Sequence, residues 1–169
     1  MAANDFTLSV SELRRLLDYD PETGVFRWIK GPSNIIKAGS VAGAVCTKGY
    51  RQIKIGGKAH MAHRLAWLHH YGSWPTDQID HINGAPDDNR ISNLREATGS
   101  HNSCNRSVRS DSGTGIKGVH WLKSRRRWRV TVMHQGRRKY IGMYQEIDDA
   151  VAAATAARER LHKEFARHA

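Results

Sequence analysis

The sequence stretch that decides the fold covers residues 74–106 and reads WPTDQIDHINGAPDDNRISNLREATGSHNSCNR. Apolar residues mark two short extended pieces in it, at 79–82 and 91–94, and the residues between them are typical of turns. Thr98 can cap a helix over the end of the stretch. The pattern therefore predicts a strand, a loop, a second strand and a helix. Because its core is so small, we expect packing on the preceding helix, or a bound ion, to help hold it.

The residues before this stretch predict a small region of helix and hairpin. Apolar residues at helical spacing predict a short helix over 9–17, and YDPETGVFRW at 19–28 predicts a turn that enters a strand. Residues 50–55 predict one arm of a hairpin that is closed by a Gly-Gly pair at 56–57. The period then becomes helical over 59–71, AHMAHRLAWLHHY.

The residues after the decisive stretch predict a small sheet and a helix. The Ser- and Gly-rich segment NRSVRSDSGTG at 105–115 reads as a linker. Three short strands follow at 118–120, 128–133 and 139–144, and a helix at 146–165 carries alanines at helical spacing. Alternate residues of the middle strand point to opposite faces of the sheet. We therefore expect one face to pack on the helix and the other face to be basic.

The fold class predicted from these elements is α+β. A small N-terminal helix and hairpin region leads into a strand–strand–helix unit, and a three-stranded antiparallel sheet packed on one helix follows. The predicted domains are residues 1–105, with a motif core at 74–106, and residues 116–169, joined by a linker at 106–115.

Charge is divided unevenly between these two regions. Residues 1–105 hold 12 Lys or Arg and 10 Asp or Glu, a net charge of +2. Residues 106–169 hold 15 and 6, a net charge of +9, which completes the +11 of the chain. Nine basic residues and no acidic one lie within 117–139. A run of charge is usually a solvated face, but one this uniform, interleaved with aromatic residues, favours a surface that follows phosphates.

Composition excludes several classes of protein. With 169 residues, of which 39% are hydrophobic, the chain can form small cores, so wholesale disorder is not expected. No apolar run is long enough for a transmembrane helix, and MAANDFTLSV at the N-terminus lacks the pattern of a secretory signal. Cys46 and Cys104 are too few for a disulfide framework and form no C-x-x-C pair, which favours a reduced, cytoplasmic protein.

Four polar residues of the decisive stretch suit the hydrolysis of a phosphodiester. That reaction needs a base to activate water and a cation to neutralise charge in the transition state. The imidazole of His81 suits the first task. A hard divalent cation suits the second, and the oxygens of Asp80 and Asn102 are ligands that Mg²⁺ accepts. Asn93 can hydrogen-bond one imidazole nitrogen and leave the other as the base.

A structural interpretation of the same residues stays open at this point. An Asp-His pair followed by asparagines is commoner in loops than in active sites. Asn89, Asn93 and Asn105 are typical of turns and caps, and His81 is equally well explained as a half-buried histidine with satisfied hydrogen bonds.

The run IDHINGAPDDNRISNLREATGSHNSCN closely resembles the HNH endonuclease motif of phage and mobile-intron enzymes, in which a ββα-metal unit is formed by two strands and a helix. The resemblance implies that Asp80 and Asn102 bind the metal, that His81 is the general base and that Asn93 orients it. Many relatives have His in place of this last Asn. Because His101 lies beside it, either His101 or Asn102 is the ligand on the helix. The C-x-x-C pairs of some relatives are absent, so no structural zinc is expected.

Two earlier segments resemble sequences that accompany this phage subfamily. They are AHRLAW at 62–67 and DYDPETGVFRW at 18–28. In the first of them, His63 and Arg64 either approach the scissile phosphate or brace the structure as part of a helix.

The C-terminal sequence resembles the ethylene-response-factor-type DNA-binding domain. The shared features are a Gly-Val pair near the first strand, a second strand that begins at Trp128, a Tyr-Ile-Gly third strand and a helix that begins acidic and continues in alanine. In that family the sheet lies in the major groove of DNA. Together with strand phase, the resemblance implies a DNA-facing set made up of Lys123, Arg125 and Arg126 in a loop and of His120, Arg127, Arg129, Thr131, Arg138 and Tyr140 on the strands.

These features together predict a metal-dependent endonuclease that hydrolyses double-stranded DNA, a homing or mobile-element enzyme of a phage or its host. The cofactor is expected to be Mg²⁺, and no membrane partner is expected. Hydrolysis would leave a 5′ phosphate and a 3′ hydroxyl, as the resemblance implies. One active site per chain predicts a nick unless two chains assemble, and the sequence leaves the oligomeric state open. The alternatives are a non-catalytic, sequence-specific DNA-binding regulator with a relic HNH unit, and a ribonuclease.

Overall fold

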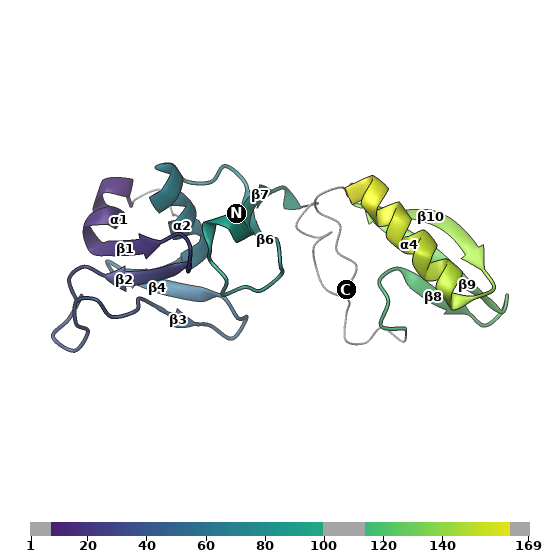
Figure 1. The fold of residues 1–169 in the computed structure, drawn as a ribbon, viewed down its shortest axis with the longest axis horizontal. Helices are drawn as coiled ribbons and strands as arrows, with labels where there is room; N and C mark the ends of the chain where they lie inside the picture. The colour runs from purple at the N-terminus through teal and green to yellow at the C-terminus, as the bar shows by residue number, and fades with distance from the viewer. Residues whose placement is uncertain (1–7, 100–113, 163–169) are drawn as a thin grey trace. The chain divides into compact units, whose positions relative to one another are not determined.

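The computed structural model describes residues 8–99 and 114–162 (Figure 1). The chain divides into two compact units, residues 1–96 and residues 97–169. Each unit has its own secondary structure and its own hydrophobic cluster. The two units are therefore described one after the other.

The first unit begins with a short helix that leads directly into a hairpin. Helix α1 (Val10–Leu16) begins at Ser9, whose hydroxyl accepts a hydrogen bond from the backbone N–H of Glu12 at 3.2 Å. Strands β1 (Leu17–Asp20) and β2 (Val25–Trp28) pair antiparallel. Their turn contains Gly24 at a φ of 72°, a backbone conformation that glycine adopts at little cost.

A three-stranded sheet and a second helix complete the N-terminal half of this unit. Strands β3 (Ala44–Val45), β4 (Arg51–Ile55) and β5 (Lys58–Met61) pair antiparallel in that order. Helix α2 (Ala62–Tyr71) follows β5 and ends at a glycine in the left-handed conformation. The hairpin closed by two glycines is confirmed. The predicted helix start at residue 59 is wrong, because residues 58–61 pair with β4 instead.

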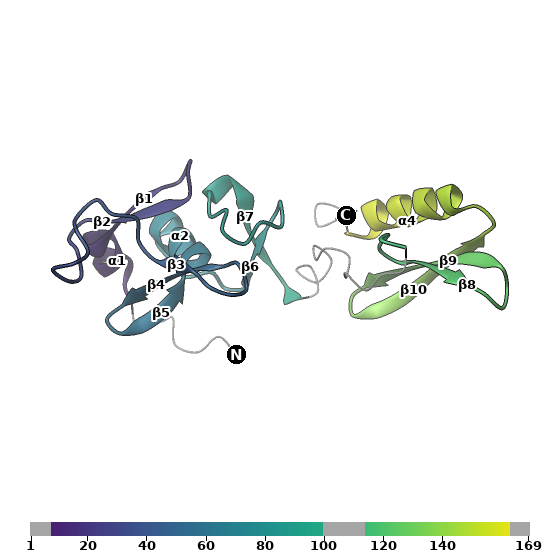
Figure 2. The same ribbon diagram turned by 90° about the horizontal axis from the view of Figure 1, so that it is seen from below.

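The decisive stretch forms a small two-stranded sheet. Strand β6 (Gln78–His81) pairs with β7 (Leu94–Ala97), and the long loop between them ends in a single turn of 3-10 helix, η2 (Ile91–Asn93). Figure 2 shows β6, β7 and their loop as one end of this unit. The second extended piece therefore begins three residues later than predicted, because residues 91–93 form the 3-10 turn. The helix predicted after Thr98 falls mostly on residues 100–113, which lie outside the described residues.

One hydrophobic cluster joins most of these elements. Its fully buried side chains come from α1, β1, β2, β4 and α2, and Ile79 of β6 and Leu94 of β7 pack against the same cluster. The tiny sheet of β6 and β7 thus shares the core of the region before it. The members that are completely inaccessible to solvent are Leu13, Leu17, Phe26, Ala42, Ile53, Ala62, Leu65 and Ala66.

The turn of the first hairpin packs directly on the loop that precedes η2. The Tyr19 hydroxyl donates to the carbonyl of Asn89 at 2.8 Å, and the N–H of Ile91 donates to the carbonyl of Pro21 at 3.1 Å. A Cβ atom added to Gly24 would lie 2.4 Å from the backbone nitrogen of Arg90. The hairpin and the loop therefore fit together with no room for a side chain.

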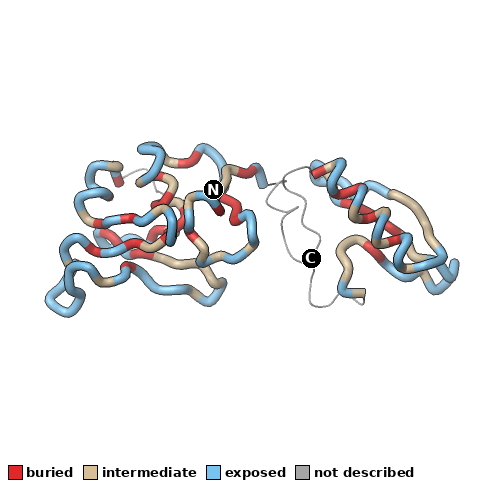
Figure 3. Tube along the Cα trace, viewed as in Figure 1, coloured by how far each residue is buried: buried red, intermediate tan, exposed pale blue. Residues whose placement is uncertain are grey.

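The second unit is a three-stranded antiparallel sheet covered on one face by a helix. Strands β8 (Val119–Leu122), β9 (Arg127–His134) and β10 (Arg137–Tyr144) lie in the order β10-β9-β8. Helix α4 (Ile147–His162) lies along the sheet, and its buried residues form a stripe (Figures 1 and 3). The buried cluster consists of Val119, Val130, Ala150 and Ala154. Small alanine side chains let the helix approach the sheet closely.

The predicted α+β class is confirmed by the three α-helices and several small antiparallel sheets of the described residues. The predicted limits of the linker stay a prediction, because residues 100–113 are not described. Among the described residues, none of the helices combines the length and apolar character that a membrane span requires.

Replacement of Gly24 by Ala should destabilise the first unit by about 2 kcal/mol, because a positive φ is costly for alanine and the added methyl group would collide with the backbone at Arg90. Gly57→Ala is the matched control, since Gly57 has a φ of 83° and nothing within 4 Å of an added Cβ. Urea denaturation should show a clearly smaller loss for the control. Equal losses would mean that the close packing contributes nothing.

Acid should destabilise the first unit through its buried histidines. Burial, with His81 and Arg64 nearby, lowers the pKa of His63 from 6.5 to about 3. The unfolded chain therefore binds a proton more readily, so this stability is complete above pH 6.5 and is lost as the pH falls toward 3. At pH 5 the loss is up to about 2 kcal/mol. Denaturation at about pH 7.5 and pH 5 measures it. His63→Gln should reduce the difference between the two pH values, and an unchanged difference would contradict this explanation.

Candidate functional site

Strand β6 carries the two residues that the sequence singled out for chemistry. Asp80 is 4% exposed and His81 is 5% exposed. Arg95, on the neighbouring strand β7, donates to Oδ2 of Asp80 from Nε at 3.0 Å and from Nη2 at 2.8 Å. The carboxylate is therefore held in the interior by a paired guanidinium.

Two aromatic rings from outside the decisive stretch surround His81. The ring centroid of His63, on α2, lies 5.2 Å from that of His81 in an edge-on arrangement. Tyr50, just before β4, lies 5.8 Å from His81 and 5.5 Å from His63. His63 is 9% exposed, and its Nδ1 atom has no hydrogen-bond partner among the described residues. Of the two roles open to His63, the buried position suits a brace beside the imidazole.

Burial favours the neutral form of the His81 imidazole. Burial lowers its pKa, and a hydrogen bond with Asn89 and the charges of Asp80, Asp88 and Asp87 oppose that change in part. A neutral imidazole can accept a proton, so the ring is in the protonation state of a general base at neutral pH.

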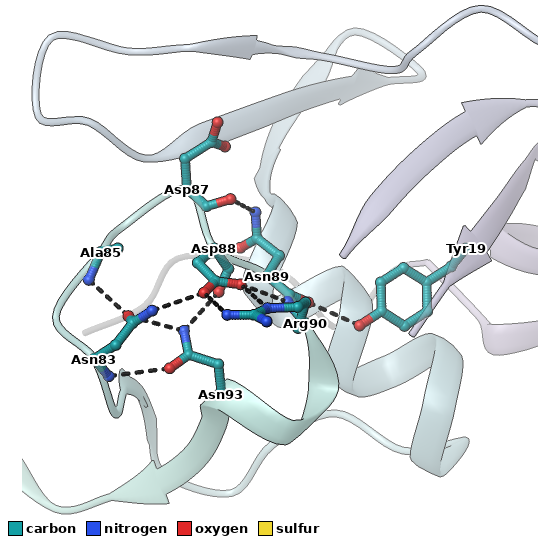
Figure 4. Close-up of polar contacts among 8 residues, drawn as sticks. All are labelled: Tyr19, Asn83, Ala85, Asp87, Asp88, Asn89, Arg90 and Asn93. Carbon is teal, nitrogen blue, oxygen red and sulfur yellow. Dashed lines mark hydrogen bonds and ion pairs between the residues drawn. The ribbon is translucent and has the colours of Figure 1, made fainter. Parts of the chain in front are cut away.

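The loop between β6 and η2 is fixed by a dense set of hydrogen bonds (Figure 4). Asn93 accepts from the backbone N–H of Asn83 at 3.0 Å and donates through Nδ2 to Oδ1 of Asn83 at 3.0 Å and to the carbonyl of Asp88 at 2.8 Å. Asn83 also donates to the carboxylate of Asp88 and accepts from the N–H of Ala85. The loop therefore has one preferred conformation.

These contacts define what Asn93 does in this structure. Both hydrogens of its Nδ2 atom are used within the loop, so none is left for a bond to His81. The amide that borders the imidazole is Asn89 instead. An influence of Asn93 on His81 therefore passes through the conformation of the loop, and its role as the orienting residue stays a prediction.

Two further ion pairs anchor the outer side of this loop. Arg51, on β4, donates to both carboxylate oxygens of Asp87 at 2.9 and 2.8 Å. Arg90 donates to both oxygens of Asp88 at 2.8 and 2.6 Å, and this pairing lowers the pKa of Asp88 to about 2. Arg64 lies near the site but contacts the carbonyl of Asp77 and the ring of Trp74.

A metal ion at this site would draw only part of its ligands from the described residues. Within residues 8–99 and 114–162, no group of three or more His, Cys, Asp and Glu side chains is placed to hold a metal ion. The buried carboxylate of Asp80 fits a hard cation, which takes oxygen ligands and needs only one or two from the protein when it keeps its waters. Both candidates for the helix ligand, His101 and Asn102, lie outside the described residues.

The strand register of the second unit brings most of the predicted DNA-facing residues together on the face opposite α4. His120 lies opposite Arg129, Thr131 opposite Tyr140, and Arg138 opposite Met133. Side chains directly opposite one another in an antiparallel pair share a face. The residues of this set, which we call the basic face, are His120, Arg127, Arg129, Thr131, Arg138 and Tyr140.

Exposure differs strongly among members of the basic face. Tyr140 is 61% exposed, whereas Thr131 is only 9% exposed and offers little surface for contact. The Nε atom of Arg129 is buried and has no hydrogen-bond partner in the part of the chain that the structure describes. Burial, Arg129 and Arg138 lower the pKa of His120. The cations of this face thus lie close enough to repel one another.

The loop residues predicted to contact phosphates lie between two strands. Lys123, Arg125 and Arg126 are exposed in the turn from β8 to β9, and Arg126 has a φ of 49°. They form the tip of the hairpin next to the basic face.

Sequence reasoning missed Arg95 and Tyr50, and it gave Asn89 only a role in turns and caps. Only the alternation of β7 could have indicated Arg95, because it places successive side chains of that strand on opposite faces of the sheet. No local signal marks Tyr50, since its contact with His81 joins residues 31 positions apart in the sequence.

Comparison with known proteins gives a match to a family model and a match to a phage protein, but none to a solved structure. A family model described as HNH endonuclease matches residues 60–104. Protein 3.8 of Escherichia phage T7 is 34% identical over 121 residues, which cover 71% of this chain and 97% of the phage protein. No solved structure matches the chain.

The family match begins at the end of β5 and includes α2, β6, the loop and β7, so it covers Asp80, His81, Asn93 and His63 together. The similarity to the phage protein extends well beyond that segment. The chain therefore belongs to the HNH endonuclease family, with its HNH domain at residues 60–104 and a relative in a phage.

Proposed function

We propose that this protein is a metal-dependent endonuclease that hydrolyses phosphodiester bonds of double-stranded DNA. The observation that carries the proposal is a neutral imidazole, His81, next to a buried carboxylate, Asp80, on one strand inside the HNH domain. The pair combines a proton acceptor with a ligand for a hard cation, and these are the two requirements of phosphodiester hydrolysis.

In the proposed reaction His81 takes a proton from a water molecule, and the oxygen of that water attacks phosphorus in line with the departing 3′ oxygen. Asp80, with Asn102 or His101 from the following segment, would hold a divalent ion, Mg²⁺ by preference. When bound, such an ion supplies positive charge for the transition state and for the departing oxygen. Asn93 keeps the loop after β6 in place and thereby positions His81.

The exposure of His81 adds a requirement to this proposal. At 5% exposure the imidazole offers little surface to a phosphate. We therefore propose that binding of DNA opens the surroundings of His81. In this proposal the HNH domain carries the catalytic residues, and the opening allows a phosphate of the DNA to reach His81.

The second unit would bind DNA through its basic face. This proposal rests on the shared face of His120, Arg129 and Arg138, and on the buried Nε atom of Arg129, which has no hydrogen-bond partner within residues 8–99 and 114–162. A phosphate or a base edge would supply the acceptor that the protein does not. An ethylene-response-factor-type domain in this position, and a homing or mobile-element role inside the cell, follow from the resemblance and belong to the same proposal.

One observation favours a different function, a DNA-binding regulator without catalysis. His81 is buried, and the carboxylate of Asp80 is already paired with Arg95. Both features are compatible with an HNH unit that has become structural. An activity assay separates the two functions.

Supercoiled plasmid DNA should be nicked or cut by the wild-type protein with Mg²⁺. His81→Ala should bind DNA normally but cut it at least 100-fold more slowly, since a general base contributes about 10²–10⁴ in rate. His70→Ala, which replaces an exposed histidine of α2, should cut like the wild type. Intact plasmid with the wild-type protein across Mg²⁺, Mn²⁺ and Ca²⁺ would leave the regulator as the function, and preferential cleavage of RNA would indicate a ribonuclease.

Removal of a cationic side chain from the basic face should lower the affinity for DNA and make that affinity less sensitive to salt concentration. We expect Arg129→Ala to lower the affinity about tenfold, and to reduce the slope of log K against log salt concentration by about one if the side chain contacts a phosphate. Lys139→Ala is the control, because Lys139 pairs with Val132 on the other face of β10. Fluorescence anisotropy over a salt series measures both quantities. Equal losses for the two variants would show that overall charge, and not this face, determines binding.

A further inference from the structure

A buried ion pair lies within the candidate site. Nε and Nη2 of Arg95 both donate to the same atom, Oδ2 of Asp80, at 3.0 and 2.8 Å. The Asp80 side chain is 4% exposed and that of Arg95 is 15% exposed. Both residues belong to the first unit, on the paired strands β6 and β7.

The burial of this pair distinguishes it from the other ion pairs of the same unit. In the pair of Arg51 with Asp87 the side chains are 23% and 39% exposed, and in the pair of Arg90 with Asp88 they are 49% and 18% exposed. Water can replace either partner in those two pairs at small cost. At Asp80 it cannot, because a buried carboxylate without a cation is strongly unfavourable.

A metal ion and Arg95 would satisfy the same need. Each supplies positive charge to the Asp80 carboxylate, and two cations on one carboxylate repel each other in a poorly solvated site. A guanidinium beside a carboxylate favours its anionic form, and by Coulomb repulsion it weakens the binding of a second cation to the same carboxylate.

We propose that Arg95 is the internal counter-ion of Asp80 and that a divalent metal ion competes with it for the carboxylate. This inference rests on the proposed function, in which Asp80 is a metal ligand. Arg95 stabilises the metal-free protein and lowers its affinity for the metal. The guanidinium that the metal displaces carries a fork of donors suited to a phosphate, so DNA at the site would offer it a new partner and favour metal binding.

Calorimetric titration of the full-length protein with Mg²⁺, without DNA, tests the competition. Arg95→Met should bind Mg²⁺ about tenfold more tightly than the wild type, which is the lower end of the effect of one adjacent arginine. Arg95→Lys, which keeps the charge but not the two-pronged contact, should fall between them. Arg51→Met removes a comparable pair with Asp87 and should stay within about twofold of the wild type.

The variant Asp80→Asn separates this inference from the proposed function. If the wild type binds Mg²⁺ and Asp80→Asn does not, Asp80 is established as a ligand. If both Arg95 variants then bind Mg²⁺ equally or more weakly than the wild type, the competition is wrong and the metal site stands. If the wild type shows no binding that depends on Asp80, the metal site and the competition are both overturned.

A measurement on the wild type covers the case in which Arg95→Met does not fold. The Nε–H of Arg95 is visible by nitrogen-15 NMR and can be assigned by its loss in Arg95→Lys. Because it donates to a buried carboxylate, we expect slow exchange with water in the metal-free protein. Saturation with Mg²⁺ should shift the signal and speed its exchange. A signal that Mg²⁺ leaves unchanged would overturn the competition.

Discussion

The negative charge of Asp80 is buried inside the first unit, and burial of a charge is tolerated only when an opposite charge accompanies it. Arg95 meets this condition from the next strand, so an ion pair joins β6 to β7 in addition to their backbone hydrogen bonds. Loss of one partner of such a pair costs about 3–5 kcal/mol, a large share of the stability of a small domain. The two-stranded sheet of β6 and β7 depends on this interaction, and the same carboxylate is the residue most suited to chemistry.

The geometry around that pair is imposed by segments that lie far away in the sequence. Tyr19 and Gly24, in the first hairpin, contact the backbone of the loop after β6. Asn93 holds the same loop through hydrogen bonds to Asn83 and Asp88. His63 and Tyr50 enclose the imidazole of His81 from the other elements of the unit. The N-terminal helix and hairpin region is therefore the support of the HNH domain, because the two strands of the motif bury too little surface to hold these positions alone.

The second unit places apolar and cationic side chains on opposite faces of one sheet. Val119 and Val130 pack under the alanines of α4, while the basic face gathers cations whose mutual repulsion the unit must tolerate. A protein that needed only stability would have no reason to group cations in this way, since like charges destabilise a folded surface. A polyanion would remove the repulsion on binding, which is the physical basis for the proposal that this face binds DNA.

Local sequence determined the type of most described elements, together with the two faces of the second sheet and the position of Asp80 and His81, because hydrophobic period and turn chemistry act between near neighbours, but it did not predict strands β1 and β3. It misplaced the start of α2, where the pairing of residues 58–61 with β4 overrides a helical pattern. Only the tertiary structure decided that Arg95 neutralises Asp80, that Asn93 serves the loop and that His81 is buried. These three features depend on burial and on contacts between segments that are distant in the sequence. The periodicity of the chain does not indicate which distant side chain will pair with Asp80 or pack against His81.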